Sequence, residues 1–315
     1  MLKNVMRMSA LLLSALVVAG CGSSSEPSAT TKAPAEKISV VTTTPVLSDF
    51  ARIIGGDRVE VYDVIKPNMD PHDYEPTPAD ITALTTADVI VKNGLGLESW
   101  FDDTMKNADA NALIVDASTG VTTRNETATT GDAVNDQSEP DPHIWHSVIN
   151  AKTMVANVRN GLSSVDSANA SIYQGNERAY NAQLDALRSD IARQLTVLTN
   201  KKIVTNHDAL GYYIDEFGLT YVGSIIPSFD SQAELSSSQV TDIVAKIKAE
   251  QVKAIFTESS LPDRVAQTIS DEAGVKIVAG EDSLYADSMG VEGSDADTYL
   301  KMERHNTSVI ARNLV

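Results

Sequence analysis

The feature that most constrains the fold is an alternation of short β-branched runs with amphipathic stretches, which occurs in both halves of the chain. The strand-like runs are residues 38–44, 59–65, 88–94 and 112–118 in the first half and 202–208, 219–225, 253–259 and 275–281 in the second. Strands that alternate with helices form parallel sheets with helices on both faces. The sequence therefore predicts an α/β protein of two lobes, each with a roughly four-stranded parallel sheet flanked by helices.

Capping signals mark the helices that follow the first two strand-like runs. Thr44 can cap a helix in which Pro45 takes the first position, and Gly56 lies where that helix should end. Thr77 and Asp80 have the spacing of a capping box at the start of the next helix. These signals agree with the strand–helix alternation.

A long stretch between the two halves predicts a single extended helix. Apolar residues keep helical spacing for about eight turns over residues 169–200, and no proline interrupts them. The residues on the predicted apolar face are Ile172, Tyr173, Tyr180, Leu184, Leu187, Ile191, Leu195 and Leu198. At 1.5 Å per residue, about 30 residues make a rod roughly 45 Å long. A coiled-coil seam is the alternative, but charges fill much of the other face, so we expect a rigid connector between the lobes.

The N-terminal residues have the pattern of a bacterial lipoprotein signal. Lys3 and Arg7 precede an apolar run that is too short to span a bilayer as a permanent helix. The run ends in VVAGC, which resembles a lipobox; an ordinary signal peptide beside a chance cysteine is the alternative. Cys21 is the only cysteine, so an internal disulfide is not available. We expect residues 1–20 to be removed and Cys21 to be lipidated, which would anchor the protein to the bacterial membrane on its extracytoplasmic side.

The remaining chain divides by composition and pattern. Residues 21–37 are rich in Ser, Ala, Thr and Pro, which predicts a flexible tether. We expect an N-terminal lobe over 38–165, the connecting helix over 166–200 and a C-terminal lobe over 201–315. The polar and acidic stretch 122–141 predicts a solvated loop, and it contains no histidine run.

Charge limits the partners that the protein can have. The formal net charge is −18, and removal of a signal that holds Lys3 and Arg7 makes it more negative. Nucleic-acid binding needs clustered Lys and Arg, so this balance argues against a nucleic-acid partner. Attraction to an anionic membrane surface is equally disfavoured, which leaves the lipid as the anchor. We expect a monomer.

Three of the five histidines stand at strand-to-helix junctions. His72 lies in the loop after the second strand-like run, His143 stands just before a helical pattern, and His207 directly follows the run KIVTN. Asp287 lies beyond the last strand-like run. Ligand sites in open α/β sheets lie outside the carboxyl ends of the strands. Any one of these histidines alone would be read as a hydrogen-bonded loop residue, but three imidazoles and a carboxylate together can form the first shell of a divalent transition ion.

Six sequence words carry a resemblance to a known family. They are DPHDYEPTPAD, NGLGLESW, DPHIW, NHDALGYY, AIFTESSLP and LYADSMG followed by TYLKMERHN. In this order, over essentially all of residues 38–315, the chain resembles the TroA-like metal-binding lipoproteins of bacterial zinc and manganese ABC importers. The resemblance implies two α/β lobes joined by one long helix, an ABC permease as partner, and metal ligands at four positions. Those positions are His72, His143, His207 and Asp287.

Two acidic choices near the implied ligands stay open. Asp282 competes with Asp287 because EDSLYADSMG contains Asp-Ser twice, and Asp287 is preferred for its spacing of ten residues before Asp297. Asp73 and Glu75 are candidates for second-shell carboxylates that orient His72, since a metal-bound imidazole usually donates its other N–H. Solvation of these side chains is the alternative.

Three further residues are weighed as supports rather than ligands. Glu258 ends the run AIFTE and is a candidate to brace the ligand loops of the C-terminal lobe, with ordinary loop hydrogen bonding as the alternative. His146 replaces the apolar residue that is usual after the tryptophan in the resembled family. We expect neither His146 nor His305 to be a metal ligand.

The donor set limits the choice of metal. Three imidazoles favour Zn²⁺ over Mn²⁺ in intrinsic affinity, whereas a carboxylate that binds through both oxygens lets Mn²⁺ compete. The resemblance does not decide, because the long histidine-rich loop of many zinc members and the glutamate of many manganese members at the third histidine are both missing. We expect Zn²⁺ or Mn²⁺, with Zn²⁺ favoured, and binding that weakens below about pH 6.5 as imidazoles become protonated.

Two other functions are weighed against metal capture. A secreted zinc-dependent hydrolase would need an open coordination position and a general base, and the sequence has no His-Glu-x-x-His pair or nucleophile elbow. A surface adhesin is the second alternative, but no residue here indicates a host receptor. We therefore expect a solute-binding protein that is not an enzyme.

Overall fold

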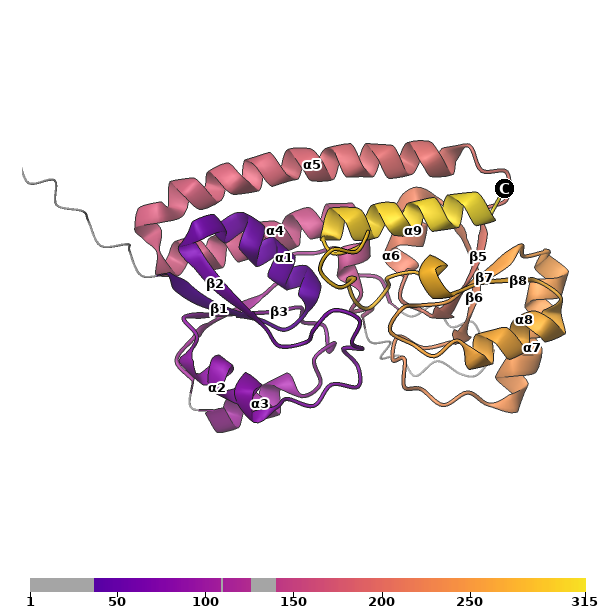
Figure 1. The fold of residues 1–315 in the computed structure, drawn as a ribbon, viewed down its shortest axis with the longest axis horizontal. Coiled ribbons are helices and arrows are strands. Elements are labelled where there is room, and N and C mark those ends of the chain that lie inside the picture. The colour runs from indigo at the N-terminus through magenta and orange to yellow at the C-terminus, as the bar shows by residue number, and fades with distance from the viewer. Residues whose placement is uncertain (1–36, 109, 126–139) are drawn as a thin grey trace, which may run out of the picture. The chain divides into compact units, whose positions relative to one another are not determined.

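The computed structural model describes residues 37–108, 110–125 and 140–315 (Figure 1). The expected signal peptide, Cys21 and nearly all of the expected tether lie outside the described residues, as does most of the polar stretch 122–141. Residues 37–315 form one compact unit. No helix in the described ranges is long and apolar enough to cross a membrane.

Two four-stranded sheets, parallel throughout, form the framework of this unit. The first sheet contains β1 (Ile38–Thr42), β2 (Val59–Asp63), β3 (Val89–Lys92) and β4 (Leu113–Asp116) in the order β2-β1-β3-β4. The second contains β5 (Lys202–His207), β6 (Thr220–Ile226), β7 (Ala254–Phe256) and β8 (Lys276–Val278) in the order β6-β5-β7-β8. The two sheets thus have the same topology, and the predicted pair of parallel sheets is confirmed. In each, the direction of strand addition reverses beside the first strand, where α/β proteins place ligands.

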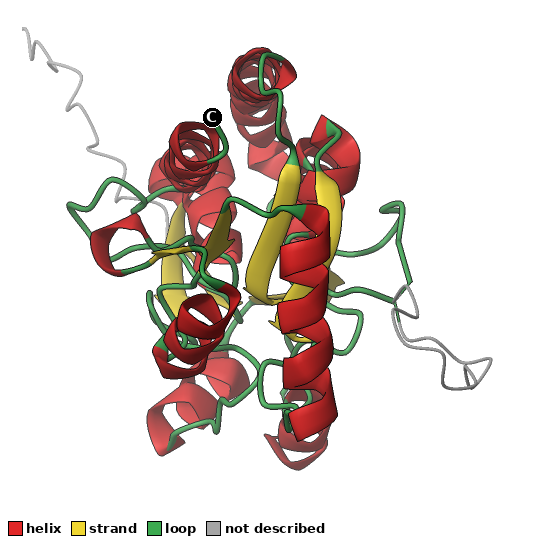
Figure 2. Ribbon diagram, turned by 90° about the vertical axis from the view of Figure 1, so that its right-hand side faces the viewer, coloured by secondary structure: helices red, strands yellow, loops and turns green. Residues whose placement is uncertain are grey.

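Helices cover both faces of each sheet (Figure 2). The helices of the first half are α1 (Pro45–Gly55), α2 (Pro78–Thr86), α3 (Phe101–Ala108) and α4 (Val148–Val165), and those of the second are α6 (Gly211–Phe217), α7 (Ser237–Glu250), α8 (Arg264–Ala273) and α9 (Tyr299–Asn313). Short 3-10 turns are η1 (Gly56–Arg58), η2 (Ile144–His146), η3 (Ser167–Asn169) and η4 (Gly280–Asp282). Thr44 caps α1, and Thr77 with Asp80 forms the predicted capping box of α2.

The long helix α5 (Ala170–Thr196) has 27 residues, which correspond to about 40 Å. It packs against α1 and α4 of the first half and against α6 and α9 of the second (Figure 1). Its buried residues are Tyr173, Tyr180, Leu184, Leu187, Ile191 and Leu195. The predicted helix is confirmed, but the placement of Ile172 on its apolar face is wrong. Tyr173 occupies the buried position and donates a hydrogen bond to Asp166, which turns Ile172 outward with 45% of its surface exposed.

One apolar core is continuous across both sheets. It includes side chains of β1 and β3, of β5 and β7, and of α1, α4, α5, α6 and α9. Smaller clusters fill the outer faces, under α2 and α3 in the first half and under α7 and α8 in the second. Because the shared core runs from one sheet to the other, the two halves are held together by packing and not by α5 alone.

Candidate metal centre

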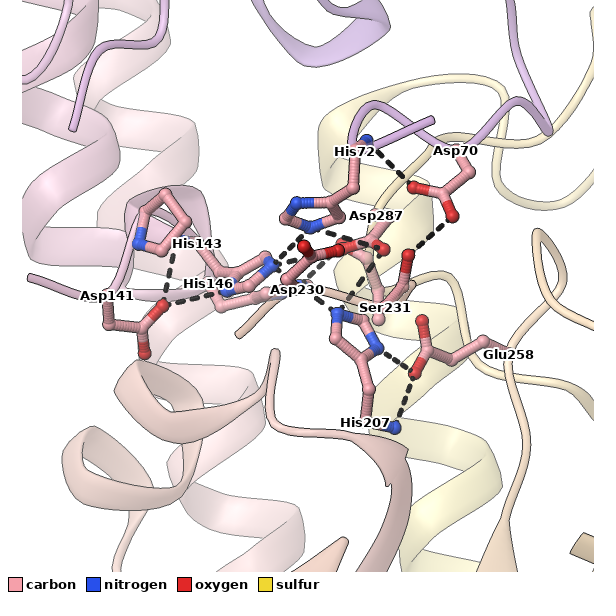
Figure 3. A network of polar contacts seen from close by, with 12 residues as sticks. Asp70, His72, Asp141, His143, His146, His207, Asp230, Ser231, Glu258 and Asp287 are labelled. Carbon is pink, nitrogen blue, oxygen red and sulfur yellow. Dashed lines mark hydrogen bonds and ion pairs between the residues drawn. The ribbon is translucent and has the colours of Figure 1, made fainter. Parts of the chain in front are cut away.

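Four side chains from separate segments meet at the carboxyl ends of the strands (Figure 3). His72 lies in the loop between β2 and α2, and His143 immediately precedes η2. His207 is the last residue of β5, and Asp287 lies in the loop between η4 and α9. One ligand atom from each residue lies within 4.8 Å of all the others. The structure therefore brings together the four residues that the resemblance implied.

The distances in the cluster have the scale of a metal shell. His143 Nε2 lies 3.2 Å from His72 Nε2 and 3.4 Å from His207 Nε2. Asp287 Oδ1 lies 3.2 Å from His143 Nε2, and Asp287 Oδ2 lies 3.3 Å from His207 Nε2 and 3.8 Å from His72 Nε2. In a tetrahedron with bonds of about 2.1 Å, ligand atoms are about 3.4 Å apart. The cluster fits one small divalent ion at its centre.

The buried carboxylate of Asp287 supports the same conclusion. Apart from the neighbouring histidine rings, neither of its oxygens has a polar partner among the described residues. An unsatisfied buried carboxylate is unfavourable unless a cation or proton donor accompanies it. Its two oxygens face different histidines, Oδ1 towards His143 and Oδ2 towards His207. Both could therefore reach the same ion.

Buried carboxylates orient two of the imidazoles. Asp141 Oδ1 lies 2.7 Å from His143 Nδ1, and Glu258 Oε1 lies 2.5 Å from His207 Nδ1. Glu258 Oε1 also accepts a hydrogen bond from the backbone N–H of His207, at 3.2 Å. When Nδ1 donates to a carboxylate, Nε2 is left as the acceptor that a metal requires. Glu258 therefore contacts the ligand His207 directly, through both its ring and its backbone N–H.

Asp73 and Glu75 do not orient His72. Both side chains are exposed, and no hydrogen bond or ion pair in the described part of the chain joins either of them to His72. The loop residue that contacts His72 is Asp70, whose Oδ1 accepts from the His72 backbone N–H at 2.9 Å. The interpretation of Asp73 and Glu75 as second-shell groups is not supported, and both carboxylates are exposed.

The repeated word Asp-Pro-His has a definite local structure. Asp70 Oδ1 accepts from the N–H of His72, and Asp141 Oδ1 accepts from the N–H of His143 at 3.0 Å. This is an Asx-turn, in which the aspartate fixes the backbone two residues further on. The Asp-Pro lead-in in DPHDYEPTPAD and DPHIW indicates a restrained backbone before each histidine, and the structure identifies the Asp70 and Asp141 carboxylates as the acceptors.

Charge in the cluster is redistributed by these contacts. Burial opposes a positive imidazole at His143, but its contacts with Asp141 and Asp287 outweigh burial and raise its pKa to about 9. Burial likewise opposes the charge of His207, and Asp287 nevertheless raises its pKa well above the usual value. Burial favours neutral Asp287, but His207 and His143 hold its pKa well below its usual range. At His72 burial prevails and lowers the pKa. A metal must therefore displace protons from His143 and His207.

The other histidines and the competing aspartate lie outside the cluster. His146 Nδ1 contacts Glu303 Oε1 at 2.9 Å, and its Nε2 contacts the Ala286 carbonyl at 2.8 Å, so both ring nitrogens are occupied. His305 is bonded in the same manner, to Asp295 and to the Ser283 carbonyl. Asp282 pairs with Arg312 and does not belong to the cluster.

A pocket of about 160 Å³ leads to one side of the cluster. His72 is the only one of the four candidate ligands that lines it, and the other three are buried. Phe229 and Asp230 of the opposite half form another part of its wall, and Pro142 lies beside them. Access to the cluster is therefore on the His72 side.

Comparison with known proteins places the chain among metal-binding proteins. The family described as zinc-uptake complex component A, periplasmic, matches residues 40–313. The manganese-binding lipoprotein MntA of Halalkalibacterium halodurans is 32% identical over 308 residues, which cover 96% of each chain. The chain belongs to the family of zinc-uptake complex component A. The resemblance in the six sequence words is thereby confirmed.

Solved structures of similar proteins have the same fold. The periplasmic zinc-binding protein TroA from Treponema pallidum is 27% identical, with a TM-score of 0.79 over 89% of this chain and 99% of TroA. A Mn-bound periplasmic metal-binding protein from Candidatus Liberibacter asiaticus is 26% identical, with a TM-score of 0.78 over 89% of this chain and 100% of its own. Relatives are thus described with both of the metals that the donor set suggested.

Proposed function

We propose that this protein captures a divalent transition metal, Zn²⁺ or Mn²⁺, and delivers it to the permease of an ABC importer. The ligands are His72, His143, His207 and Asp287. The observation that carries the proposal is the convergence of these four residues at the spacings of a single metal shell. The names of the relatives, manganese-binding lipoprotein and zinc-binding periplasmic protein, support the metal and the transport role.

The arrangement of the chain suits capture and delivery. We divide it into an N-terminal lobe (38–165) that supplies His72 and His143, a connecting helix (166–200), and a C-terminal lobe (201–315) that supplies the other two ligands. A lipid on Cys21, after removal of residues 1–20, holds the monomeric protein at the outer side of the membrane. Relatives named as ABC-transporter lipoproteins support this location and a permease partner.

The geometry favours binding over catalysis. Four protein ligands fill a tetrahedral shell, whereas a catalytic zinc keeps a position for water or substrate. The carboxylates that contact ligand rings, Asp141 and Glu258, are engaged by His143 and His207, and both side chains are buried. The protein therefore acts as a carrier for the ion and not as a hydrolase.

Zn²⁺ binds more tightly than Mn²⁺ at this donor set. Mn²⁺ stands low in the Irving–Williams order of affinities, and three imidazole ligands suit Zn²⁺ better than Mn²⁺. The metal that is imported then depends on which ion is available outside the cell as well as on affinity. Competition between the two metals for the purified protein measures the intrinsic preference.

Metal titration of the chelator-treated protein tests the proposal. The wild type should bind one equivalent of either ion, and His143→Ala should weaken binding steeply because it removes the ligand that contacts all three others. His305→Ala is the matched control, since it removes a buried histidine outside the cluster. Unchanged affinity in His143→Ala, with the fold intact by circular dichroism, would rule out this site.

A further inference from the structure

η2 (Ile144–His146), the turn that follows His143, contacts the backbone directly before Asp287. The carbonyl of Ala286 accepts two hydrogen bonds, at 2.8 Å from Nε2 of His146 and at 3.1 Å from Nε1 of Trp145. Asp287 itself lies outside helices and strands, so no backbone ladder fixes it. One short turn therefore carries His143 and also holds the backbone directly before the carboxylate ligand.

His146 is itself held by a buried carboxylate. Its Nδ1 lies 2.9 Å from Oε1 of Glu303 in α9, and both side chains are fully buried. Because a carbonyl can only accept, Nε2 of His146 carries the proton directed at Ala286. A buried polar pair is often less favourable than apolar side chains of similar volume. The hydrogen bond to Ala286 is the specific interaction that apolar side chains could not provide.

Both oxygens of the Asp287 carboxylate point towards the other ligands. Oδ1 lies 3.2 Å from His143 Nε2 and Oδ2 lies 3.3 Å from His207 Nε2, and apart from the histidine ligands neither oxygen has a polar partner among the described residues. A carboxylate held in this way can bind one ion through both oxygens. A carboxylate free to rotate would bind through one.

We propose that His146 is a positioning residue that keeps both oxygens of Asp287 directed at the ion and thereby raises the affinity for Mn²⁺ relative to Zn²⁺. This rests on the proposed function. Zn²⁺ is satisfied by three imidazoles and one oxygen in a tetrahedron. Mn²⁺ gains less from imidazole and more from carboxylate oxygens, so loss of the second oxygen weakens Mn²⁺ binding more than Zn²⁺ binding.

The test is a pair of double variants in which His146 and Glu303 are replaced together, so that neither is left buried without its partner. His146→Leu with Glu303→Leu removes the hydrogen bond from His146 to the Ala286 carbonyl. Because both members of the His146–Glu303 pair are replaced, no polar partner is left alone in the core. His146→Gln with Glu303→Gln retains a side-chain amide that can donate to Ala286. His305→Leu is the matched control, because its Nε2 also contacts a backbone carbonyl, that of Ser283 at 3.0 Å, and its Nδ1 also contacts a carboxylate.

Affinities for Zn²⁺ and Mn²⁺ are measured by competition with chelators, and Co²⁺ spectra report the coordination number. In the leucine pair we expect Mn²⁺ affinity to fall by about 10–100-fold, the usual effect of losing an outer-shell contact, with Zn²⁺ affinity changed by less than about threefold. The Co²⁺ absorption should become more intense, as expected for four-coordinate ions. The glutamine pair should restore most of the Mn²⁺ affinity, and His305→Leu should leave the ratio of the two affinities unchanged.

An equal loss of affinity for both metals in the leucine pair would overturn the inference, because it would show only a structural role. An unchanged ratio would overturn it as well. If the wild-type protein bound neither metal, the proposed function would fail, and the role of His146 would fail with it.

Discussion

At the scale of single residues, the pKa values of the ligands determine how metal binding depends on pH. The usual imidazole pKa suggested that affinity falls below about pH 6.5. The acidic partners of His143 raise its pKa to about 9, and that of His207 is also raised. Since both rings must lose a proton to bind a metal, protons already compete at neutral pH.

We therefore predict that the apparent affinity for Zn²⁺ rises with pH through the neutral range and levels off near pH 9. Binding at pH 7 should release protons from His143 and His207. Calorimetry in buffers of different ionisation enthalpy measures that release directly. A constant affinity between pH 6 and 9, without proton release, would contradict the assignment of these two rings as ligands.

Asp141 is predicted to set the metal affinity through its contact with His143. In Asp141→Asn the ring loses a charged acceptor at Nδ1, so binding of Zn²⁺ should weaken by about 10–100-fold. Asp215→Asn is the matched control. Asp141 and Asp215 both pair with Arg124, at 2.7 Å and 3.2 Å, but Asp215 is largely exposed and contacts none of the four ligands. Equal affinities of the two variants, measured by chelator competition, would show that the Asp141 contact does not matter.

How far these residues could be predicted from the sequence depends on the range of each contact. Asp70 and Asp141 lie two residues from a ligand histidine, so the motif alone contained the signal. Glu258 lies 51 residues from His207 and meets it because β5 and β7 are neighbours in the sheet. The role of Asp73 stayed open because closeness along the chain does not give the direction of a side chain in an irregular loop.

At the scale of elements, the loop that carries His72 is fastened to the other half of the molecule. Asp70 Oδ2 accepts from Ser231 Oγ at 2.6 Å and from Gln232 Nε2 at 3.0 Å. The N–H of Asn68 donates to the Met289 carbonyl at 3.1 Å. His72 also lines the access pocket. We therefore expect the ion to leave by release of this loop.

Ser231→Ala is predicted to shorten the residence time of the metal. Loss of a hydrogen bond to a charged group costs about 1.5 kcal/mol, which corresponds to roughly a tenfold faster dissociation. Stopped-flow transfer of Zn²⁺ to a chelator measures the rate, and Ser189→Ala on the exposed face of α5 is the control. An unchanged dissociation rate would show that the fastened loop does not limit release.

The elements themselves were largely predictable, because their signals are local. Capping residues located the starts of α1 and α2, and the long apolar period located α5. The last two strands contain only three residues each, shorter than their strand-like runs, because the chain leaves the sheet after Phe256 and after Val278. Ile172 was misplaced because two adjacent apolar residues competed for one buried position.

At the scale of the whole molecule, the continuous core predicts a small response to metal. Side chains of both sheets and of α5 pack in one cluster, so a large hinge motion would expose apolar surface. We expect the metal-free and loaded forms to differ mainly in the ligand loops, above all in the loop of His72. Distances between spin labels on α2 and α7 would report this, and a large rotation of one half against the other would contradict it.

The arrangement of the two halves could not be predicted from the residues alone. Each strand–helix alternation predicts its own sheet, but the meeting of both sheets at one set of four ligands depends on contacts between distant segments. The hydrogen bonds from η2 to Ala286 span about 140 residues. The positions of the histidines after strand-like runs suggested a shared site, and the resemblance to a known family named its four residues.

A crystal structure of the metal-loaded protein, with anomalous diffraction at the absorption edge of the bound ion, tests the central claim most directly. The account predicts one strong peak about 2.0–2.3 Å from Nε2 of His72, His143 and His207 and from the carboxylate of Asp287. A peak at any other place, or a peak that one of these four side chains does not reach, would contradict it.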